Sequence, residues 1–175
     1  MAIKLTERIW RARGESRYTD GHRDIIKVIL LLCQAGAHED LVTAIERLGH
    51  LEMDLDRWDE ARGVYEEGIR ICRNAGDSFG MAHKIQHLGM VHRHAGREDE
   101  AWACFQEALS LYRGRKQPPK LNYANAIMAV VQLKEELDQV DQAKELLTEA
   151  RELNQAMNVQ ASVGDCSNRI AKLSR

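Results

Sequence analysis

The histidines are the residues of this 175-residue chain whose type and spacing could do chemistry. His83 and His87 are four residues apart, so on a helix their rings share one face and could hold a metal ion together. His94 lies on a similar face, but seven further residues place it about 10 Å along the helix axis. Bonds of about 2 Å to a shared ion would strain that geometry. The segment HKIQH also lacks the glutamate that a zinc-hydrolase helix uses as its general base. The sequence therefore favours solvated groove or surface histidines and no metal site.

Other catalytic patterns are missing from the sequence. There is no GxSxG, no phosphate-binding glycine loop, no dinucleotide fingerprint and no Cys–His nucleophile arrangement. The acidic pairs Glu66-Glu67 and Glu135-Glu136 are adjacent, so their carboxylates point to different sides of a helix and are interpreted as solvated charge. We expect a protein that is not an enzyme and needs no cofactor, with a histidine-based metal enzyme as a remote alternative.

The near-zero net charge argues against polyanions and membrane surfaces as partners. The chain has 25 Lys+Arg against 27 Asp+Glu, a net charge of -2, which gives no electrostatic attraction to a polyanion or a membrane surface. The only basic concentration is RGRKQPPK, from Arg113 to Lys120, and it lacks interleaved aromatic residues for base stacking. We interpret it as a solubilising loop and predict no nucleic-acid or membrane partner.

The compartment is predicted from apolar runs and cysteines. No apolar run approaches the roughly 18 residues that span a bilayer, and the start of the chain has no signal-peptide core. The four cysteines form no CxxC motif, so they are expected to be small buried hydrophobes in a reducing compartment. We expect a cytoplasmic protein. The cysteines are Cys33, Cys72, Cys104 and Cys166.

The elements that must position these side chains repeat along the sequence. Residues 44–72 align with residues 84–112 at a step of 40, and a third copy over 126–153 follows at a step of 42. Small and large residues recur in fixed positions of the copies. The matches are Leu48-Gly49 with Leu88-Gly89, Ala61 with Ala101 and Ala143, Tyr65 with Phe105, Gly68 with Ala108 and Ala150.

Each unit is predicted to be two helices. In residues 44–72 the first apolar stripe is Ile45, Leu48, Leu51 and Leu55, and the second is Ala61, Tyr65, Gly68 and Ile69. Glycine inside a helix costs up to about 1 kcal/mol relative to alanine, so its recurrence indicates close helix packing around a bulky wedge. An aspartate is expected in the first turn of each second helix, where it meets the positive end of the helix dipole. These aspartates are Asp59, Asp99 and Asp141.

This small-large pattern resembles the tetratricopeptide repeat, in its long-helix variant with a period near 40 residues. The family's usual Trp is replaced by Ile45 or Ile85, and its usual Tyr by Glu52 or His92. The resemblance implies one all-α domain, a right-handed α-α superhelix (solenoid) of about four helix-turn-helix repeats plus a C-terminal capping helix. The expected boundaries are 1–36, 37–76, 77–117 and 118–157 for the repeats and 158–174 for the cap.

The two ends of the stack are predicted differently. The last segment is amphipathic, as a helix that covers the final apolar face must be. Near the start, Ile3 and Trp10 add apolar surface outside the expected stripe; they either pack locally or contact a partner, a second copy or an upstream domain. The stripe of the capping helix is Val159, Val163, Cys166, Ile170 and Leu173.

The resemblance also implies a concave groove, lined by the first helices of successive repeats, that holds a peptide. Methionines there adapt to apolar ligands and amides pair with a peptide backbone, while groove histidines would make binding sensitive to pH near 6 to 7. The positions at which chaperone-binding members place Lys and Asn hold Glu46, His50, Gln86, Met90 and Met128, so a chaperone C-terminal tail is disfavoured. The implied groove residues are Thr43, Glu46, His50, Met53, Asp54, His83, Gln86, Met90, Arg93, His94, Asn125, Met128, Gln132, Glu135 and Glu136.

Two function classes follow from these expectations. The first is a protein-interaction module, an adaptor or regulatory domain, that binds a peptide or protein segment in the concave groove. The second is a structural scaffold that self-associates as a homo-oligomer through the end carrying Ile3 and Trp10. The sequence does not identify the partner.

Overall fold

A computed structural model describes residues 24–29, 31, 32, 36 and 38–174 of the chain. Residues 24–29 and 31–32 are helical, and the part of the chain described contains no strand. The first predicted repeat therefore lies mostly outside the described residues. The helices that follow are α3 (His38–Asp54), α4 (Trp58–Asn74), α5 (Ser78–His94), α6 (Glu98–Arg113), α7 (Lys120–Glu136), α8 (Val140–Gln155) and α9 (Gln160–Leu173).

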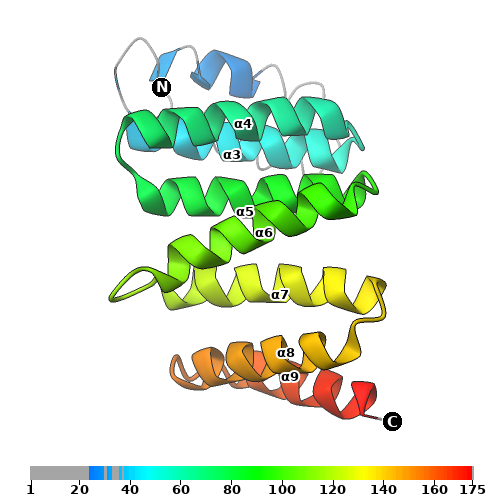
Figure 1. The fold of residues 1–175 in the computed structure, drawn as a ribbon. Coiled ribbons are helices and arrows are strands. Elements are labelled where there is room, and N and C mark those ends of the chain that lie inside the picture. The colour runs from blue at the N-terminus through cyan, green and yellow to red at the C-terminus, as the bar shows by residue number, and fades with distance from the viewer. Residues whose placement is uncertain (1–23, 30, 33–35, 37, 175) are drawn as a thin grey trace.

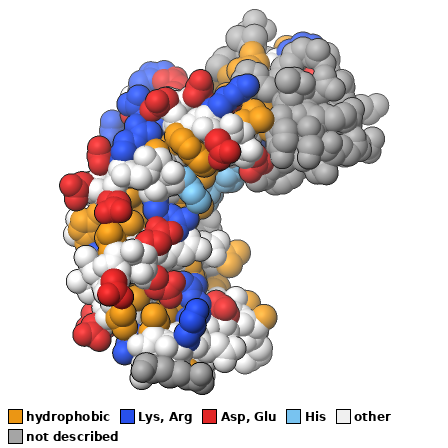
Figure 2. All heavy atoms as spheres, turned by 90° about the vertical axis from the view of Figure 1, so that its right-hand side faces the viewer, with side chains coloured by type: hydrophobic (Ala, Val, Ile, Leu, Met, Phe, Trp, Pro, Cys, Tyr) orange, Lys and Arg blue, Asp and Glu red, His pale blue; other side chains and the backbone are white. Residues whose placement is uncertain are grey.

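The helices form antiparallel hairpins that stack into a curved array (Figure 1). Each helix packs on the next along the chain, and α5 also contacts α3 and α7 directly. The first helices of the hairpins therefore follow one another along the array. Figure 2 shows the array as an arc, with histidine side chains in its hollow, and these belong to α3 and α5. The fold is the predicted all-α superhelix.

The turns between helices repeat as well as the helices do. A residue in the left-handed region closes the turn after α3, α4, α5, α7 and α8. Asparagine, aspartate and glycine tolerate this conformation better than other residues, so these turn positions suit their residue types. The residues are Asp56, Gly76, Gly96, Asp138 and Asn158, with φ between 54° and 71°.

The predicted close packing of small residues against aromatic wedges is confirmed. A β-carbon at Gly49 would overlap the Tyr65 ring, and one at Gly89 would lie 2.7 Å from two carbons of the Phe105 ring. Both rings are buried. The glycines therefore let the first helix of a hairpin approach the wedge that its second helix carries.

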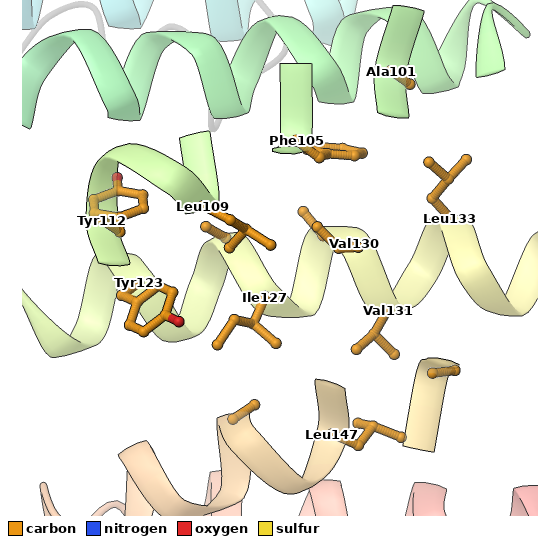
Figure 3. Close-up of a cluster of buried hydrophobic side chains, with 14 of the residues drawn as sticks. Ala101, Phe105, Leu109, Tyr112, Tyr123, Ile127, Val130, Val131, Leu133 and Leu147 are labelled. Atoms are coloured by element: carbon orange, nitrogen blue, oxygen red, sulfur yellow. The ribbon is translucent and has the colours of Figure 1, made fainter. Parts of the chain in front are cut away.

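The same wedges join one hairpin to the next. Phe105, Leu109 and Tyr112 of α6 face α7, where Val130 points back at them and Ile127 points to the side of α8 (Figure 3). Leu147 of α8 continues this core below α7, and Ala143 and Ala150 are fully buried beside it. Burial of such side chains is the main stabilising contribution in a stack of repeats.

The last helix behaves as the capping helix predicted for the end of the stack. In α9, Cys166 is 1% exposed, and Ile170 and Leu173 are half-buried against the core. Gln160, Asp165, Asn168 and Lys172 are exposed on its other face. The predicted aspartates Asp59, Asp99 and Asp141 lie in the first turns of α4, α6 and α8, respectively.

Candidate functional site

Most of the predicted groove residues lie on α3, α5 and α7 and are accessible to solvent. Gln86 differs, because it is 4% exposed and its Oε1 has no hydrogen-bond partner among the described residues. It lies below the surface, not on it. The half-buried members are Glu46, His50, Met53, His83, Met90, Arg93, Met128 and Glu135, and the exposed ones are Thr43, Asp54, His94, Asn125, Gln132 and Glu136.

The methionines of the groove are partly structural. Met90 and Met128 pack against the buried core cluster around Phe105 and Ile127. Met53 accepts a hydrogen bond from the Tyr65 hydroxyl, with the oxygen 3.9 Å from sulfur. Their flexible side chains are thus partly packed against the core and partly exposed.

Ion pairs connect each first helix to the next. One pair joins α3 to α5, a second joins α5 to α7, and a third joins α7 to α9. The carboxylates of Glu135 and Glu136, interpreted from the sequence as solvated charge, also form ion pairs, while Glu136 stays exposed. Nothing in the sequence indicated these partners, because each lies about one repeat away. The pairs are Lys84–Glu46 at 2.6 Å, Arg93–Glu136 at 3.1 Å and Arg169–Glu135 at 2.6 Å.

The pair between α3 and α5 is buried on one side. Lys84 is 1% exposed, and its Nζ donates to Glu46 Oε2. Burial opposes ionisation of this carboxyl, but the hydrogen bond from His83 and the charge of Lys84 outweigh it and hold the pKa of Glu46 well below its usual range. The carboxylate is therefore ionised at neutral pH.

Three histidines form a chain beside this pair. His50 Nε2 lies 3.4 Å from His87 Nδ1, and His87 Nε2 lies 3.3 Å from His83 Nε2. His83 Nδ1 is 3.3 Å from Glu46 Oε2. Two ring contacts at nearly right angles, between His87 and each of the other histidines, define the same arrangement. The cluster joins a Glu and a His spaced by four on α3 to two His spaced by four on α5.

His87 is the central member of this cluster and was not predicted as a site residue. Its ring stacks on Tyr65, with centroids 5.4 Å apart, and is 8% exposed. Burial lowers the pKa of His87 well below the usual value, and His50 and His83 lower it further. The ring is therefore neutral at pH 7, with a lone pair on one nitrogen.

Two histidines correct the expectation that these residues are solvated. His87 and His92 are both buried. The reason is that the first helices contact neighbouring helices on several faces, so a polar residue on α5 can be enclosed without lying on a simple apolar stripe. His50 and His87 are 37 residues apart, and no spacing in the sequence indicated their contact.

His94, at the end of α5, belongs to a separate contact. Its ring stacks on Trp58 at 5.4 Å between centroids and 9° between planes. Arg93 Nη2 lies 3.1 Å from His94 Nε2. Trp58, the first residue of α4, is half-buried and was not predicted to lie near the groove residues.

Two arginines of the basic segment 113–120 form hydrogen bonds within the chain. Arg113 donates hydrogen bonds to Tyr123 and Glu149, and Arg115 donates to Ser78 at 3.3 Å.

Cys72 and Cys166 are buried, Cys104 is half-buried, and all three are free thiols. Burial raises the pKa of all three thiols, that of Cys104 to about 11, as expected for cysteines that act as small hydrophobes.

Some predicted features lie beyond what the structure describes. Ile3, Trp10 and Cys33 are outside the described residues. Across the described helices, none is both long and apolar enough to cross a bilayer.

The stacked hairpins, the glycine–aromatic contacts and the hollow face define an α-solenoid repeat protein. The sequence matches the tetratricopeptide repeat model over residues 40–113 and 80–156. The chain therefore belongs to the tetratricopeptide repeat family, whose members generally bind protein partners. None of the curated proteins matches it significantly.

Solved structures share the fold at low sequence identity. BtubC (BKLC) from P. vanneervenii has a TM-score of 0.72 and 14% identity, and the match covers 97% of this chain and 78% of that one. A Podosopora anserina protein assigned as a kinesin light chain, with nearly identical TPR-like repeats, has a TM-score of 0.75, 14% identity, and coverage of 97% and 83%.

RapI in its apo form has a TM-score of 0.79 and 8% identity, with coverage of 94% of this chain and 60% of that chain. At these identities the likeness concerns the fold alone.

Proposed function

We propose that this protein is an interaction module that binds an extended or helical peptide segment in the hollow of the arc, and that it is not an enzyme. The observation that carries the proposal is the line of accessible polar and methionine side chains that α3, α5 and α7 present there. Membership of a family that generally binds proteins supports it. The adaptor or regulatory role and a cytoplasmic location belong to the same proposal.

The residue types suggest how the groove would bind. Asn125 and Gln132 are exposed on α7, and each offers both a donor and an acceptor to a peptide backbone. Met90 and Met128 lie half-buried on neighbouring first helices and offer adaptable apolar contact. Affinity would come from burial of ligand side chains, and specificity from the pattern of amides and charges.

The charged groove residues have a second task. Arg93, Glu135 and Glu46 already bridge consecutive first helices. A ligand that forms an ion pair with one of these residues must break an existing pair, so the net gain in binding free energy from each residue is small. We therefore assign the direct recognition to the amides and methionines, and the spacing of the helices to the ion pairs.

The experiment is a selection from a randomised peptide library displayed on phage, followed by affinity measurement with two double variants. Asn125→Ala with Gln132→Ala removes both exposed amides of α7. The loss of two hydrogen bonds of about 0.5–1.5 kcal/mol each predicts affinity weaker by roughly tenfold or more.

The matched control uses the other side of the hairpins. Gln106 on α6 and Gln142 on α8 are exposed, and neither is on a first helix. Gln106→Ala with Gln142→Ala should leave the affinity of the selected peptides unchanged. Equal binding by wild type and the α7 variant, or a loss confined to the control, contradicts the proposal.

Self-association through the end that carries Ile3 and Trp10 stays a prediction from the sequence, because those residues lie outside the described part of the chain. Light scattering over a range of concentrations tests it, and a monomer at every concentration would exclude it.

A further inference from the structure

We propose that Glu46, His50 and His87 form a binding site for a divalent transition-metal ion such as Zn²⁺ at the floor of the groove. One carboxylate oxygen and one nitrogen from each ring lie within 4.8 Å of one another. The site would be built from two consecutive repeats, since Glu46 and His50 are on α3 and His87 is on α5. This inference goes beyond peptide binding and does not depend on it.

The distance between the two ring nitrogens already suits a shared ion. Two ligands at about 2.0–2.1 Å from a tetrahedral ion are about 3.3–3.4 Å apart. His50 Nε2 and His87 Nδ1 are separated by 3.4 Å. The other separations in the set are at most 4.8 Å, and rotation of the Glu46 side chain is the movement that would shorten them.

One assignment of the ring protons makes every contact in the cluster a hydrogen bond. His83 Nδ1–H donates to the ionised Glu46, so His83 Nε2 accepts from His87 Nε2–H. His87 Nδ1 then carries a lone pair and faces His50 Nε2. An ion would take that lone pair once the His50 proton resides on Nδ1, a tautomer change that releases no proton.

His83 would contact two of the metal ligands without binding the ion itself. It contacts both Glu46 and the nitrogen of His87 that faces away from His50. Metal-binding histidines usually donate their second N–H to such a partner, which fixes the ring and its tautomer. His83 would therefore be a positioning residue for two ligands at once.

Lys84 opposes binding of a cation, because its positively charged Nζ already lies 2.6 Å from Glu46 Oε2. Among the described residues, both contacts to this carboxylate fall on Oε2, so Oε1 is the oxygen for a cation. Two imidazoles and one carboxylate suit zinc and similar ions of borderline softness, and they leave a coordination position for water or a ligand group. Glu46 and His50 are half-buried, so both are partly accessible to solvent.

The experiment is calorimetric titration of the full chain with Zn²⁺, without any peptide. Wild type should bind at this site, and His50→Gln and Glu46→Gln should each weaken that binding by about tenfold or more. His94→Gln is the matched control, because His94 is an exposed histidine at the end of α5, the helix that carries His87, and lies outside the cluster. It should bind zinc as wild type does. Circular dichroism checks that each variant is folded.

X-ray absorption at the zinc edge supplies a second readout, in which two imidazoles at about 2.0–2.1 Å are expected. The proposal is overturned if wild type binds no zinc at millimolar concentration. It is equally overturned if the folded His50→Gln and Glu46→Gln variants bind as tightly as wild type. Neither result bears on peptide binding, which the library selection tests separately.

Discussion

At the scale of single residues, two positions where the family's aromatic is replaced hold buried polar groups. Glu52 and His92 are both buried, at equivalent places in α3 and α5. Arg57 pairs with Glu52 at 3.5 Å, whereas His92 Nδ1 has no hydrogen-bond partner among the described residues. Burial lowers the pKa of His92, and Arg97 lowers it further.

This lowered pKa predicts a pH dependence of stability. The unfolded chain protonates His92 near the usual pKa of about 6.5, whereas the folded protein protonates it only at lower pH. The free energy of unfolding is therefore highest above pH 6.5 and decreases as the pH falls below that value, which is about the usual pKa. We expect His92→Leu to lose less stability than wild type between pH 7.5 and pH 5.5. One proton accounts for at most about 1.4 kcal/mol per pH unit. Urea unfolding at several pH values measures the difference.

The comparison uses the change with pH and not the stability at one pH, because the substitution also alters packing. His87 and His94 also have lowered pKa values, so the pH dependence should shrink but not vanish. Identical pH dependence in the two proteins would show that His92 is protonated equally in the folded and unfolded states.

At the scale of helices, a glycine inside a helix matters to stability where a neighbouring helix packs against it. Gly89 of α5 and Gly164 of α9 are both inside helices, but only Gly89 faces a ring. Alanine has the higher helix propensity, by about 1 kcal/mol. The same substitution should therefore have opposite effects at the two positions.

Gly89→Ala should destabilise the protein by about 1–3 kcal/mol, because its β-carbon would lie 2.7 Å from the buried Phe105 ring. Gly164→Ala should stabilise it by about 0.5–1 kcal/mol, since nothing lies within 4 Å of the added carbon. Denaturant unfolding of both variants measures these changes. A stabilised Gly89→Ala would mean that α5 and α6 are further apart than described.

The helices and their packing were predictable from the sequence because the signals recur within one repeat. Leu88-Gly89, Ala101 and Phe105 repeat an earlier pattern at fixed spacing, and the contact between Gly89 and Phe105 lies within one hairpin. The contacts across repeats were not predictable in this way. The partner of Arg93 is 43 residues away, and nothing in the spacing of charges distinguishes a pair from two solvated side chains.

At the scale of the whole molecule, ion pairs connect the helices that line the proposed groove. The ion pairs of Glu46, Arg93 and Glu135 connect α3, α5, α7 and α9 in order. Charge pairs that are partly exposed contribute little stability individually. We therefore propose that their main role is to fix the spacing between neighbouring first helices. In the proposed function, the accessible amides and methionines are the residues that contact a ligand. The family resemblance predicted these residues in a groove, whereas the ion pairs between them are seen only in the structure.

The central claim is that a peptide binds on the hollow side of the arc. Nuclear magnetic resonance of the ¹⁵N-labelled chain, titrated with a selected peptide, tests it most directly through the side-chain amides. The signals of Asn125 and Gln132 on α7 should shift with added peptide, while those of Gln106 on α6 and Gln142 on α8 stay in place. Shifts at Gln106 and Gln142 with none at Asn125 and Gln132 would contradict the account.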